Sequence, residues 1–467
     1  MLYWMMATRR LRWSHALDRA VALAEALSRP LLILEALNVS YPWACDRHHA
    51  AILDGMREHA RALAGSPIGY YPYVEPTPGA GRGLLASLAD RACAVVTDDS
   101  PVFFTPRLLE AAARIESCAV EAVDDCGLLP RRAAGRAFTA AYHFRRFLQR
   151  NLTDHLLERP AANPLAGTRL VPFGSVPSDV LERWPAATRA ALEDRAFLAS
   201  LPIDHTVGPT SWTGGHAAGA ARLSRFVADV LPRYAEERND PDADAVSGLS
   251  PWLHYGHVSA HEIFDAVASA EGWSPARITE PADGRREGWW GMSASAEAFL
   301  DQLVTWRELG YLFTTYEPDY ARYESLPEWA RATLEDHASD PRPDVYTLEQ
   351  LATAATGDTL WNAAQRQLTH DGVIHNYLRM LWGKRIIEWT SHPREALDVM
   401  IELNNRFALD GRDPNSYSGI FWVLGRFDRG WPERPIFGKV RSMSSAATRR
   451  KVRVARYLER WGEQKSL

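Results

Sequence analysis

The sequence predicts a fold of the α/β plus all-α class, in which a doubly wound, Rossmann-like parallel sheet precedes an all-helical domain. Over the first 125 residues, short apolar runs alternate with helical segments rich in Ala, Leu and Arg. This alternation is typical of a parallel sheet that helices cover on both faces. After residue 202 the pattern is helical almost throughout, and 14 of the 17 tryptophans lie from Trp184 onward. An all-helical domain so rich in aromatic residues suits a large planar ligand.

Five strands are expected in the first domain, residues 1–125. They are the apolar runs Leu2–Met5, Leu31–Leu37, Tyr70–Val74, Ala94–Thr97 and Val120–Val123. Right-handed crossovers make such a domain doubly wound, and its ligands bind beyond the carboxyl ends of the strands. Gly79, Gly81 and Gly83 follow the third strand. Their spacing lacks the last position of the dinucleotide fingerprint and comes after the wrong strand, so we expect a loop there.

A linker is expected at residues 126–201, ahead of a helical domain at 202–467. In the linker, helical segments are separated by Pro and Gly clusters such as ERPAANPLAG and VPFGSVPSD. Clusters of this composition suit a connector that crosses the surface between two domains.

The composition is that of an ordinary globular protein, with 46% hydrophobic and 24% charged residues. No apolar run approaches the roughly 20 residues that span a membrane. The four cysteines form no CxxC pair, so we expect reduced thiols of a cytoplasmic protein without a metal or disulfide role. They are Cys45, Cys93, Cys118 and Cys126. We also expect a monomer.

Positive charge is concentrated near the carboxyl terminus, although the formal net charge of the chain is −5. Residues 426–460 contain eleven Lys or Arg and three Asp or Glu. Such a patch can contact phosphates even in an acidic protein. A solvated helix face explains five of these cations equally well, so both interpretations stay open for them. They are Arg449, Arg450, Lys451, Arg453 and Arg456.

Large aromatic residues recur at helical spacing between Trp361 and Trp389. Arg379, Trp382 and Trp389 are three and seven residues apart and share one helix face, with His375 one turn earlier. Seven residues of helix separate two side chains by roughly 10 Å. Tryptophans at such steps can carry an electron from solvent to a buried redox cofactor. A tryptophan stripe at helical spacing is otherwise simply core.

Four motifs extend this region: WNAAQ, HNxxRMxW, LNxRxxLDGRDPNxYxGxxW and GWxERPxFGKxR. They resemble the flavin domain of the photolyase and cryptochrome family, and most closely class II cyclobutane pyrimidine dimer (CPD) DNA photolyases. The resemblance covers most of the chain and is dense from Leu249 to Arg441. It implies a light-dependent deoxyribodipyrimidine photo-lyase, a carbon–carbon lyase that uses reduced FAD to split pyrimidine dimers in UV-damaged DNA. It also allows a second, antenna chromophore of unknown identity in the first domain, with a deazaflavin as one candidate.

The resemblance implies FAD contacts at eight positions. These are Tyr234, Ser247, Gly248, Leu249, Ser250, Arg379, Asn404 and Asp410. Hydroxyls and an uncrowded backbone ahead of a helix favour a phosphate, although Ser before Pro is also an ordinary helix cap. Arg379 and Asp410 correspond to the family's salt bridge beside the isoalloxazine ring, and Asn404 to the residue that faces its N5 atom. A flavin that is anionic when doubly reduced needs a fixed cation nearby. A structural ion pair would use the same two residues.

Further positions correspond to the family's electron chain, lesion pocket and DNA contacts. The class II electron chain corresponds, outward from the flavin, to Trp382, Trp361 and Trp389. Trp306, Met380 and Trp422 match positions that line the pocket for the flipped dimer, where aromatic walls can stack on the lesion. The expected phosphate contacts are Lys439, Arg441 and Arg429.

One position departs from the family pattern. Four residues before Trp306 the family usually carries Glu, which is thought to hydrogen-bond the dimer, and this chain has Gln302. An amide donates a hydrogen bond but cannot transfer a proton. Asp301 is adjacent, yet one residue along a helix turns it about 100° away. Gln302 therefore favours the alternative of a cryptochrome-like blue-light photoreceptor with weak or no repair activity. A helical DNA-binding protein without a cofactor is a third alternative.

Overall fold

The computed structural model describes residues 1–462 of the chain, which forms two compact units. The sheet unit comprises Met1–Pro130, Leu152–Ser224 and Leu249–Ala266. The helical unit comprises Arg131–Asn151, Arg225–Gly248 and the chain from Val267 onward. Each unit therefore contains stretches that are distant in sequence. The predicted domain boundaries at residues 125 and 201 stay a prediction.

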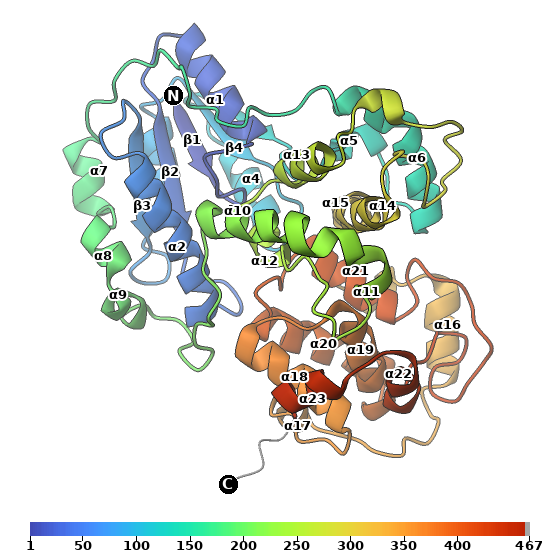
Figure 1. Cartoon of the computed structure of the whole chain (residues 1–467). Coiled ribbons are helices and arrows are strands. Elements are labelled where there is room, and N and C mark those ends of the chain that lie inside the picture. Colours follow the sequence, from blue (N-terminus) through green and yellow to red (C-terminus); the bar gives the residue numbers. More distant parts are fainter. Residues whose placement is uncertain (463–467) are drawn as a thin grey trace. The chain divides into compact units, whose positions relative to one another are not determined.

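Five parallel strands form the sheet of the first unit (Figure 1). They are β1 (Leu2–Met5), β2 (Leu32–Leu37), β3 (Gly69–Val74), β4 (Ala94–Asp98) and β5 (Ala119–Val123). Their order is β3-β2-β1-β4-β5, so the chain reverses its direction of winding between β1 and β4. The predicted doubly wound sheet is confirmed, and every predicted strand end lies within one residue of the observed one.

Side chains of each central strand alternate between two buried layers, because successive residues of a strand point to opposite faces. Tyr3 and Ile33 pack in one layer against α1 (His15–Ala26). Trp4 and Leu34 pack in the other, against α3 (Leu84–Ala89) and α7 (Ser178–Arg183). Burial on both faces explains why these strands read as continuous apolar runs. The other helices that begin in this unit are α2 (Asp46–Ala62), α4 (Thr105–Ala112), α8 (Arg189–Glu193), α9 (Arg195–Ala199), α10 (His216–Arg225), α12 (Ser250–His254) and α13 (Ala260–Ala270).

The described part of the second unit is built from helices, as predicted. Its long helices are α6 (Ala141–His155), α15 (Arg307–Tyr316), α18 (Thr359–Asp371), α19 (Asn376–Trp389), α20 (Pro393–Phe407) and α21 (Pro414–Val423). Shorter ones are α5 (Arg131–Ala134), α11 (Tyr234–Glu237), α14 (Ala294–Leu300), α16 (Glu328–Asp336), α17 (Leu348–Ala352), α22 (Ser445–Lys451) and α23 (Ala455–Trp461). Two segments are π-helices, η1 (Phe226–Val230) and η4 (Asp301–Trp306). Three are 3₁₀-helices, η2 (Leu231–Arg233), η3 (Pro275–Arg277) and η5 (Tyr323–Ser325).

Local signals fix the helices that hold the candidate site. The carboxylate of Asp358 accepts hydrogen bonds from the N–H groups of Leu360 and Trp361, both at 3.1 Å, which starts α18. Gly372 ends α18 in the left-handed conformation, with φ 72°. Proline opens both α20 and α21. Because the first N–H groups of a helix have no acceptor within it, proline loses no hydrogen bond at this position. Within residues 1–462, no helix combines the length and apolarity needed to cross a bilayer.

Candidate functional site

The three tryptophans of the predicted electron chain lie together where α18 packs on α19. The Nε1 of Trp361 donates to the carbonyl of Trp382 at 3.0 Å, and its ring meets the edge of Trp389 at a centroid separation of 5.3 Å. Trp382 donates from Nε1 to Oε1 of Gln365 at 2.8 Å. All three indoles are at most 3% exposed. The adjacent rings of Trp361 and Trp389 suit electron hopping, although buried indoles equally suit a packed core, so the role of all three stays a prediction.

An ion pair joins α19 to the segment after α20. Arg379 and Asp410 lie 3.0 Å apart between Nη2 and Oδ1, and both side chains are only partly buried. The hydroxyl of Ser416 donates to the carbonyl of Asp410 at 2.7 Å and so fixes the loop that carries the carboxylate. Asn404 is 4% exposed, and its Nδ2 donates to Oδ1 of Asn405 at 3.3 Å. The two charges pair as predicted, and a part-buried pair keeps a face available to a ligand.

His375 is a buried polar side chain for which no role was predicted. It is 7% exposed, and neither ring nitrogen has a hydrogen-bond partner within residues 1–462. Burial lowers the pKa of His375 to about 4, against the opposing effect of Asp244 and Asp240. A buried imidazole without partners costs free energy unless a ligand or water satisfies it. Its position one turn before Arg379 is the only sequence signal that could have singled it out.

The predicted diphosphate contacts are divided between the two units. In the helical unit, Tyr234 is 7% exposed and meets Phe226 and Phe299 edge to face. Gly248 has a φ of 65°, which residues with a Cβ rarely adopt. In the sheet unit, buried Leu249 precedes α12, which Ser250 begins. This helix has only five residues, so its dipole is weaker than the prediction assumed.

Gln302 and Trp306 lie on the π-helix η4, although their spacing in the sequence predicts an ordinary α-helix. π-Helices are rare and occur often at functional sites. Both side chains are half-buried, and the Gln302 amide has no hydrogen-bond partner within residues 1–462. Asp301 is 4% exposed and forms an ion pair with Arg145 at 2.8 Å. Asp301 is therefore held by Arg145, and the free amide belongs to Gln302.

Trp422 and Met380 are also half-buried, in contrast to the buried tryptophans of α18 and α19. Trp422 lies on α21 with two cations over its ring. The Nζ of Lys384 is 5.6 Å and the guanidinium carbon of Arg441 is 5.9 Å from the ring centroid. An indole that is accessible and flanked by positive charge suits an aromatic, anionic ligand. Lys384 was not predicted, because a lysine next to Arg385 on a helix gives no sign in the sequence that it is buried.

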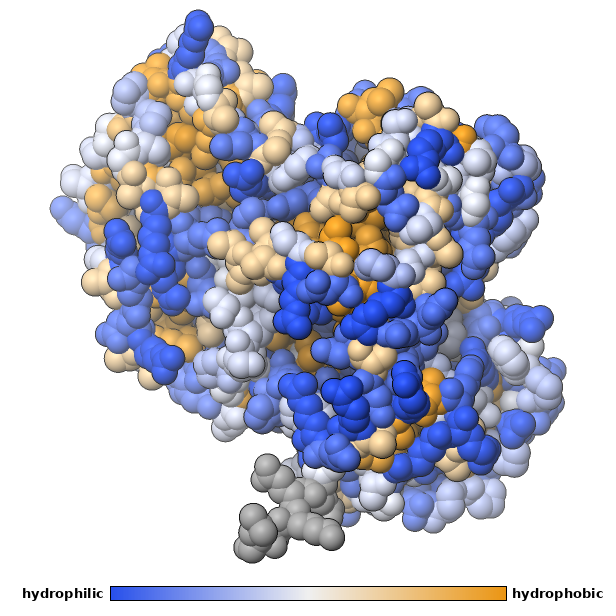
Figure 2. All heavy atoms as spheres, in the orientation of Figure 1, coloured by the Kyte–Doolittle hydropathy of each residue, from blue (hydrophilic) through white to orange (hydrophobic). Residues whose placement is uncertain are grey.

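The carboxyl-terminal cations divide into two groups. Arg429 and Arg441 stack on Trp431, at 5.3 and 4.9 Å from its ring centroid, and Lys439 is exposed beside them on the same loop. Within residues 1–462 these three make no ion pair with a carboxylate. Arg453, between α22 and α23, instead pairs with Asp240, and Arg460 of α23 lies 3.6 Å from a carboxylate oxygen of Asp371. Hydrophilic side chains gather over α22 and α23 in Figure 2. The first group is thus the better candidate for phosphate contacts, and both interpretations stay open for the cations of α22 and α23.

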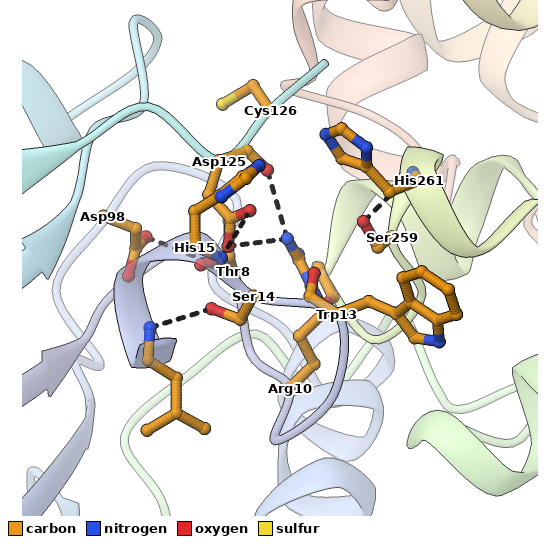
Figure 3. Close-up of polar contacts among 12 residues, drawn as sticks. Thr8, Arg10, Trp13, Ser14, His15, Asp98, Asp125, Cys126, Ser259 and His261 are labelled. Atoms are coloured by element: carbon orange, nitrogen blue, oxygen red, sulfur yellow. Dashed lines mark hydrogen bonds and ion pairs between the residues drawn. The ribbon is translucent and has the colours of Figure 1, made fainter. Parts of the chain in front are cut away.

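Figure 3 shows the carboxyl edge of the sheet, where doubly wound domains bind ligands. Asp98, at the end of β4, accepts hydrogen bonds from the N–H groups of Met6 and Thr8, both at 2.9 Å. Burial raises the pKa of this carboxyl. Arg10 and Asp125 form a buried ion pair at 2.7 Å. Because Asp98 occupies the backbone donors that would hold a phosphate, the turn after β1 is closed to a dinucleotide.

The glycines of the predicted loop form turns ahead of α3, and the N–H of Gly81 donates to Glu75. The loop prediction is therefore confirmed. Within residues 1–462, no group of three or more His, Cys, Asp or Glu side chains is arranged to hold a metal ion.

Solved structures share this fold at low sequence identity. A class III photolyase of Agrobacterium tumefaciens matches with a TM-score of 0.67 at 16% identity, over 98% of this chain and 86% of that one. A cryptochrome of Synechocystis matches with a TM-score of 0.65 at 15% identity, over 99% and 88% of the chains. A photolyase of Sulfolobus tokodaii, solved with two FAD molecules, matches with a TM-score of 0.65 at 15% identity, over 99% and 90%. The fold is that of photolyases and cryptochromes.

Curated relatives match the whole chain at higher identity. The deoxyribodipyrimidine photo-lyase of Methanothermobacter thermautotrophicus is 32% identical over 460 residues, which are 98% of this chain and 94% of that protein. The enzyme of that name from Oryza sativa is 33% identical over an alignment of 476 positions, which covers 98% of this chain and 86% of the relative. No protein-family model matches the chain. The chain belongs to the photolyase and cryptochrome family.

Proposed function

We propose that the protein is a light-dependent deoxyribodipyrimidine photo-lyase that repairs cyclobutane pyrimidine dimers in UV-damaged DNA. The observation that carries this proposal is the match of 32% identity along 98% of the chain to a protein of that name. The site supports it, because half-buried Trp306 and Trp422 lie in the same helical unit as a buried tryptophan chain. Class II is the subgroup that the quoted motifs favour.

The side chains of the helical unit fit FAD as the cofactor. Both ring nitrogens of His375 are buried without a partner, as expected where a bound group is to supply one. Arg379 and Asp410 would hold the isoalloxazine ring, Asn404 would face its N5 atom, and Tyr234 would contact the diphosphate end. Ser247, Gly248, Leu249 and Ser250 complete the proposed set. Bound in the reduced state and excited by blue or near-ultraviolet light, the flavin would lend one electron to the dimer and receive it back.

The protein's own groups would hold the lesion and keep its charge balanced. Trp306 and Trp422 would stack on the two pyrimidines of a dimer that has left the duplex, and Met380 would fill the gap beside them. The free amide of Gln302 would donate a hydrogen bond to a pyrimidine carbonyl without moving a proton. The tryptophan chain of Trp382, Trp361 and Trp389 would restore the reduced cofactor after adventitious oxidation.

Binding would rely on the cations beside Trp431, of which Arg429 and Lys439 are exposed and Arg441 is half-buried. Arg429, Lys439 and Arg441 would contact phosphates on both sides of the lesion. Because phosphate contacts release counterions, we expect the affinity for dimer-containing DNA to fall steeply with salt. We further propose a monomeric protein of the cytoplasm, which four free cysteines suit. An antenna chromophore such as a deazaflavin, bound by the sheet unit, is part of the same proposal.

The direct test is repair by the purified, FAD-loaded protein. After photoreduction, blue light should convert dimer-containing oligonucleotides to intact thymines, and the same mixture kept dark should remain unchanged. Unchanged DNA in the light, with reduced flavin bound, would contradict the proposal.

Gln302 favours the second candidate function, a cryptochrome-like photoreceptor. The substitution Gln302→Glu separates the two functions, because it restores the carboxyl that the resemblance implies. If wild-type protein repairs dimers and Gln302→Glu repairs them no better, the amide of Gln302 is sufficient for repair and the photo-lyase proposal is supported. If only Gln302→Glu repairs, the natural protein is the photoreceptor.

A further inference from the structure

Lys384 is a buried cation that the proposed function does not use. It lies on α19, two residues beyond Trp382, and it is 0% exposed. Its Nζ donates to the carbonyl of Val423, the last residue of α21, and lies 5.6 Å from the ring centroid of Trp422. The neighbouring Gly383 lets the two helices come this close, because a Cβ there would meet Val423 at 2.9 Å.

Lysine is almost never fully buried unless it is paired. Within residues 1–462 no carboxylate lies at ion-pair distance from Lys384, and Asp428 acts on it only from further away. The ammonium is held instead by a carbonyl at the carboxyl-terminal end of α21, where the helix dipole is negative, and by the face of an indole. Arg441 lies near the same indole and opposes the charge on Lys384. If Lys384 served packing alone, an apolar residue of similar size would stabilise the fold at least as well, because it carries no charge to desolvate.

We propose that Lys384 is a positioning residue, whose ammonium orients Trp422 and holds positive potential beneath the pocket for the pyrimidine dimer. The inference rests on the proposed function and deepens it. The dimer becomes an anion while it holds the borrowed electron, the two bonds between the pyrimidines break, and the electron then returns. Lys384 gains and loses nothing in this cycle. The positive charge of Lys384 stabilises the anionic form of the dimer. The neutral side chain of Gln302 cannot supply such a charge.

The charge on Lys384 depends on pH near neutrality. Burial lowers the pKa of its ammonium to about 7, with Asp428 raising and Arg441 lowering it. The ammonium is therefore present below pH 7 and is lost as the pH rises above it. If repair per absorbed photon follows the protonated fraction, it should fall by as much as about tenfold from pH 6 to pH 8.

The test compares Lys384→Met, Lys384→Arg and wild type over this pH range. Wild type should lose yield with rising pH, Lys384→Met should be low and flat, and Lys384→Arg should be flat because arginine stays charged. Lys451→Met is a matched control, since Lys451 lies 5.6 Å from the ring centroid of Tyr377 but is exposed. It should keep the wild-type pH profile. A wild-type yield that does not change with pH would overturn the inference while the proposed function stands.

Fluorescence provides a readout that does not require repair. The emission of Trp422, taken as the difference between wild type and Trp422→Phe, should change with an apparent pKa near 7, since the ammonium perturbs the indole. This titration should vanish in Lys384→Met and persist in Lys451→Met. If wild type repairs nothing but the titration is seen, the proposed function fails and the coupling of Lys384 to Trp422 stands. If no titration is seen, the inference fails.

Discussion

Trp389 shows how a single side chain can serve packing and electron transfer at once. Its ring is 1% exposed and lies between Trp361 and Tyr346, with centroid separations of 5.3 and 5.2 Å. Its Nε1 has no hydrogen-bond partner within residues 1–462. Replacement by a smaller ring disturbs packing under either interpretation, so stability alone cannot distinguish them. Only the rate of electron delivery to the flavin does.

We therefore predict that Trp389→Phe removes most of the light-driven reduction of bound flavin by an external donor, since phenylalanine is much harder to oxidise. The smaller ring leaves a cavity, which should cost about 1–3 kcal/mol. The control is Trp184→Phe, which removes an indole that is 4% exposed in the sheet unit. It should cost similar stability and leave photoreduction unchanged. The rates are followed by flavin absorbance. Equal photoreduction rates for Trp389→Phe and wild type would mean that these tryptophans serve only core packing.

At the scale of elements, the π-helix η4 presents Gln302 and Trp306 together. Its first residue, Asp301, is 4% exposed and is tied to Arg145 of α6, which is 8% exposed as a side chain. Removing one partner of a buried ion pair leaves the other charge uncompensated. The pair therefore anchors the start of η4 to a neighbouring helix.

The substitution Arg145→Met should lower the free energy of unfolding by about 3–5 kcal/mol, because it leaves the buried Asp301 carboxylate with only the exposed Arg286, 3.6 Å away. Arg322→Met provides the control, since its pair with Asp319 at 3.4 Å is exposed. That change should cost at most about 1 kcal/mol. Urea unfolding of both variants gives the two values, and equal losses would contradict an anchoring role for Arg145.

Helices and strands could be predicted from the sequence where a single pattern, such as continuous burial of a strand on both faces, determines them. The strand ends follow from apolar runs that are buried on both faces, and the prediction met them within one residue. The π-helical form of η4 was not predictable, because it differs from an α-helix only in hydrogen-bond register and no Pro or Gly marks it. The contact of Trp361 with Trp389 depends on how two helices pack, so spacing along one helix could not give it. Lys384 was missed for the same reason.

At the scale of the whole molecule, buried histidines should set the response to acid. Burial lowers the pKa of His257 and of His261 to about 3, below the 6.5 expected in an unfolded chain. Each is therefore neutral when folded and takes up a proton on unfolding between these values. A lowered folded pKa means that stability is lost as the pH falls below about 6.5, by up to about 3 kcal/mol per histidine at pH 4.

This prediction is tested with His257→Gln, which keeps a hydrogen-bond acceptor for the N–H of Gly215, 3.0 Å from Nδ1 of His257. The variant should unfold less readily with falling pH than wild type does. His205→Gln is the control with the opposite sign, because a hydrogen bond to Asp46 raises the pKa of exposed His205. Its removal should slightly steepen the loss of stability in acid. Parallel pH profiles for His257→Gln and wild type would contradict the assignment.

The family and the fold were both accessible from the sequence, the first through motifs and the second through periodicity. What the sequence could not supply is the state of each side chain, such as the free amide of Gln302 or the carboxylate of Asp98 in the turn after β1. Whether a side chain is paired or free depends on residues that lie far away in the chain. They decide which predicted site residues remain available to a ligand.

The most direct test of the account is the repair yield of FAD-loaded, reduced protein on dimer-containing DNA, measured for wild type, Trp422→Ala and Trp329→Ala. Trp422 and Trp329 are both half-buried tryptophans of the helical unit, but only Trp422 is assigned to the lesion pocket. We predict light-dependent recovery of thymine in wild type and Trp329→Ala, and loss of most of it in Trp422→Ala with flavin still bound. Equal repair by Trp422→Ala and Trp329→Ala, or none by wild type, would contradict the account.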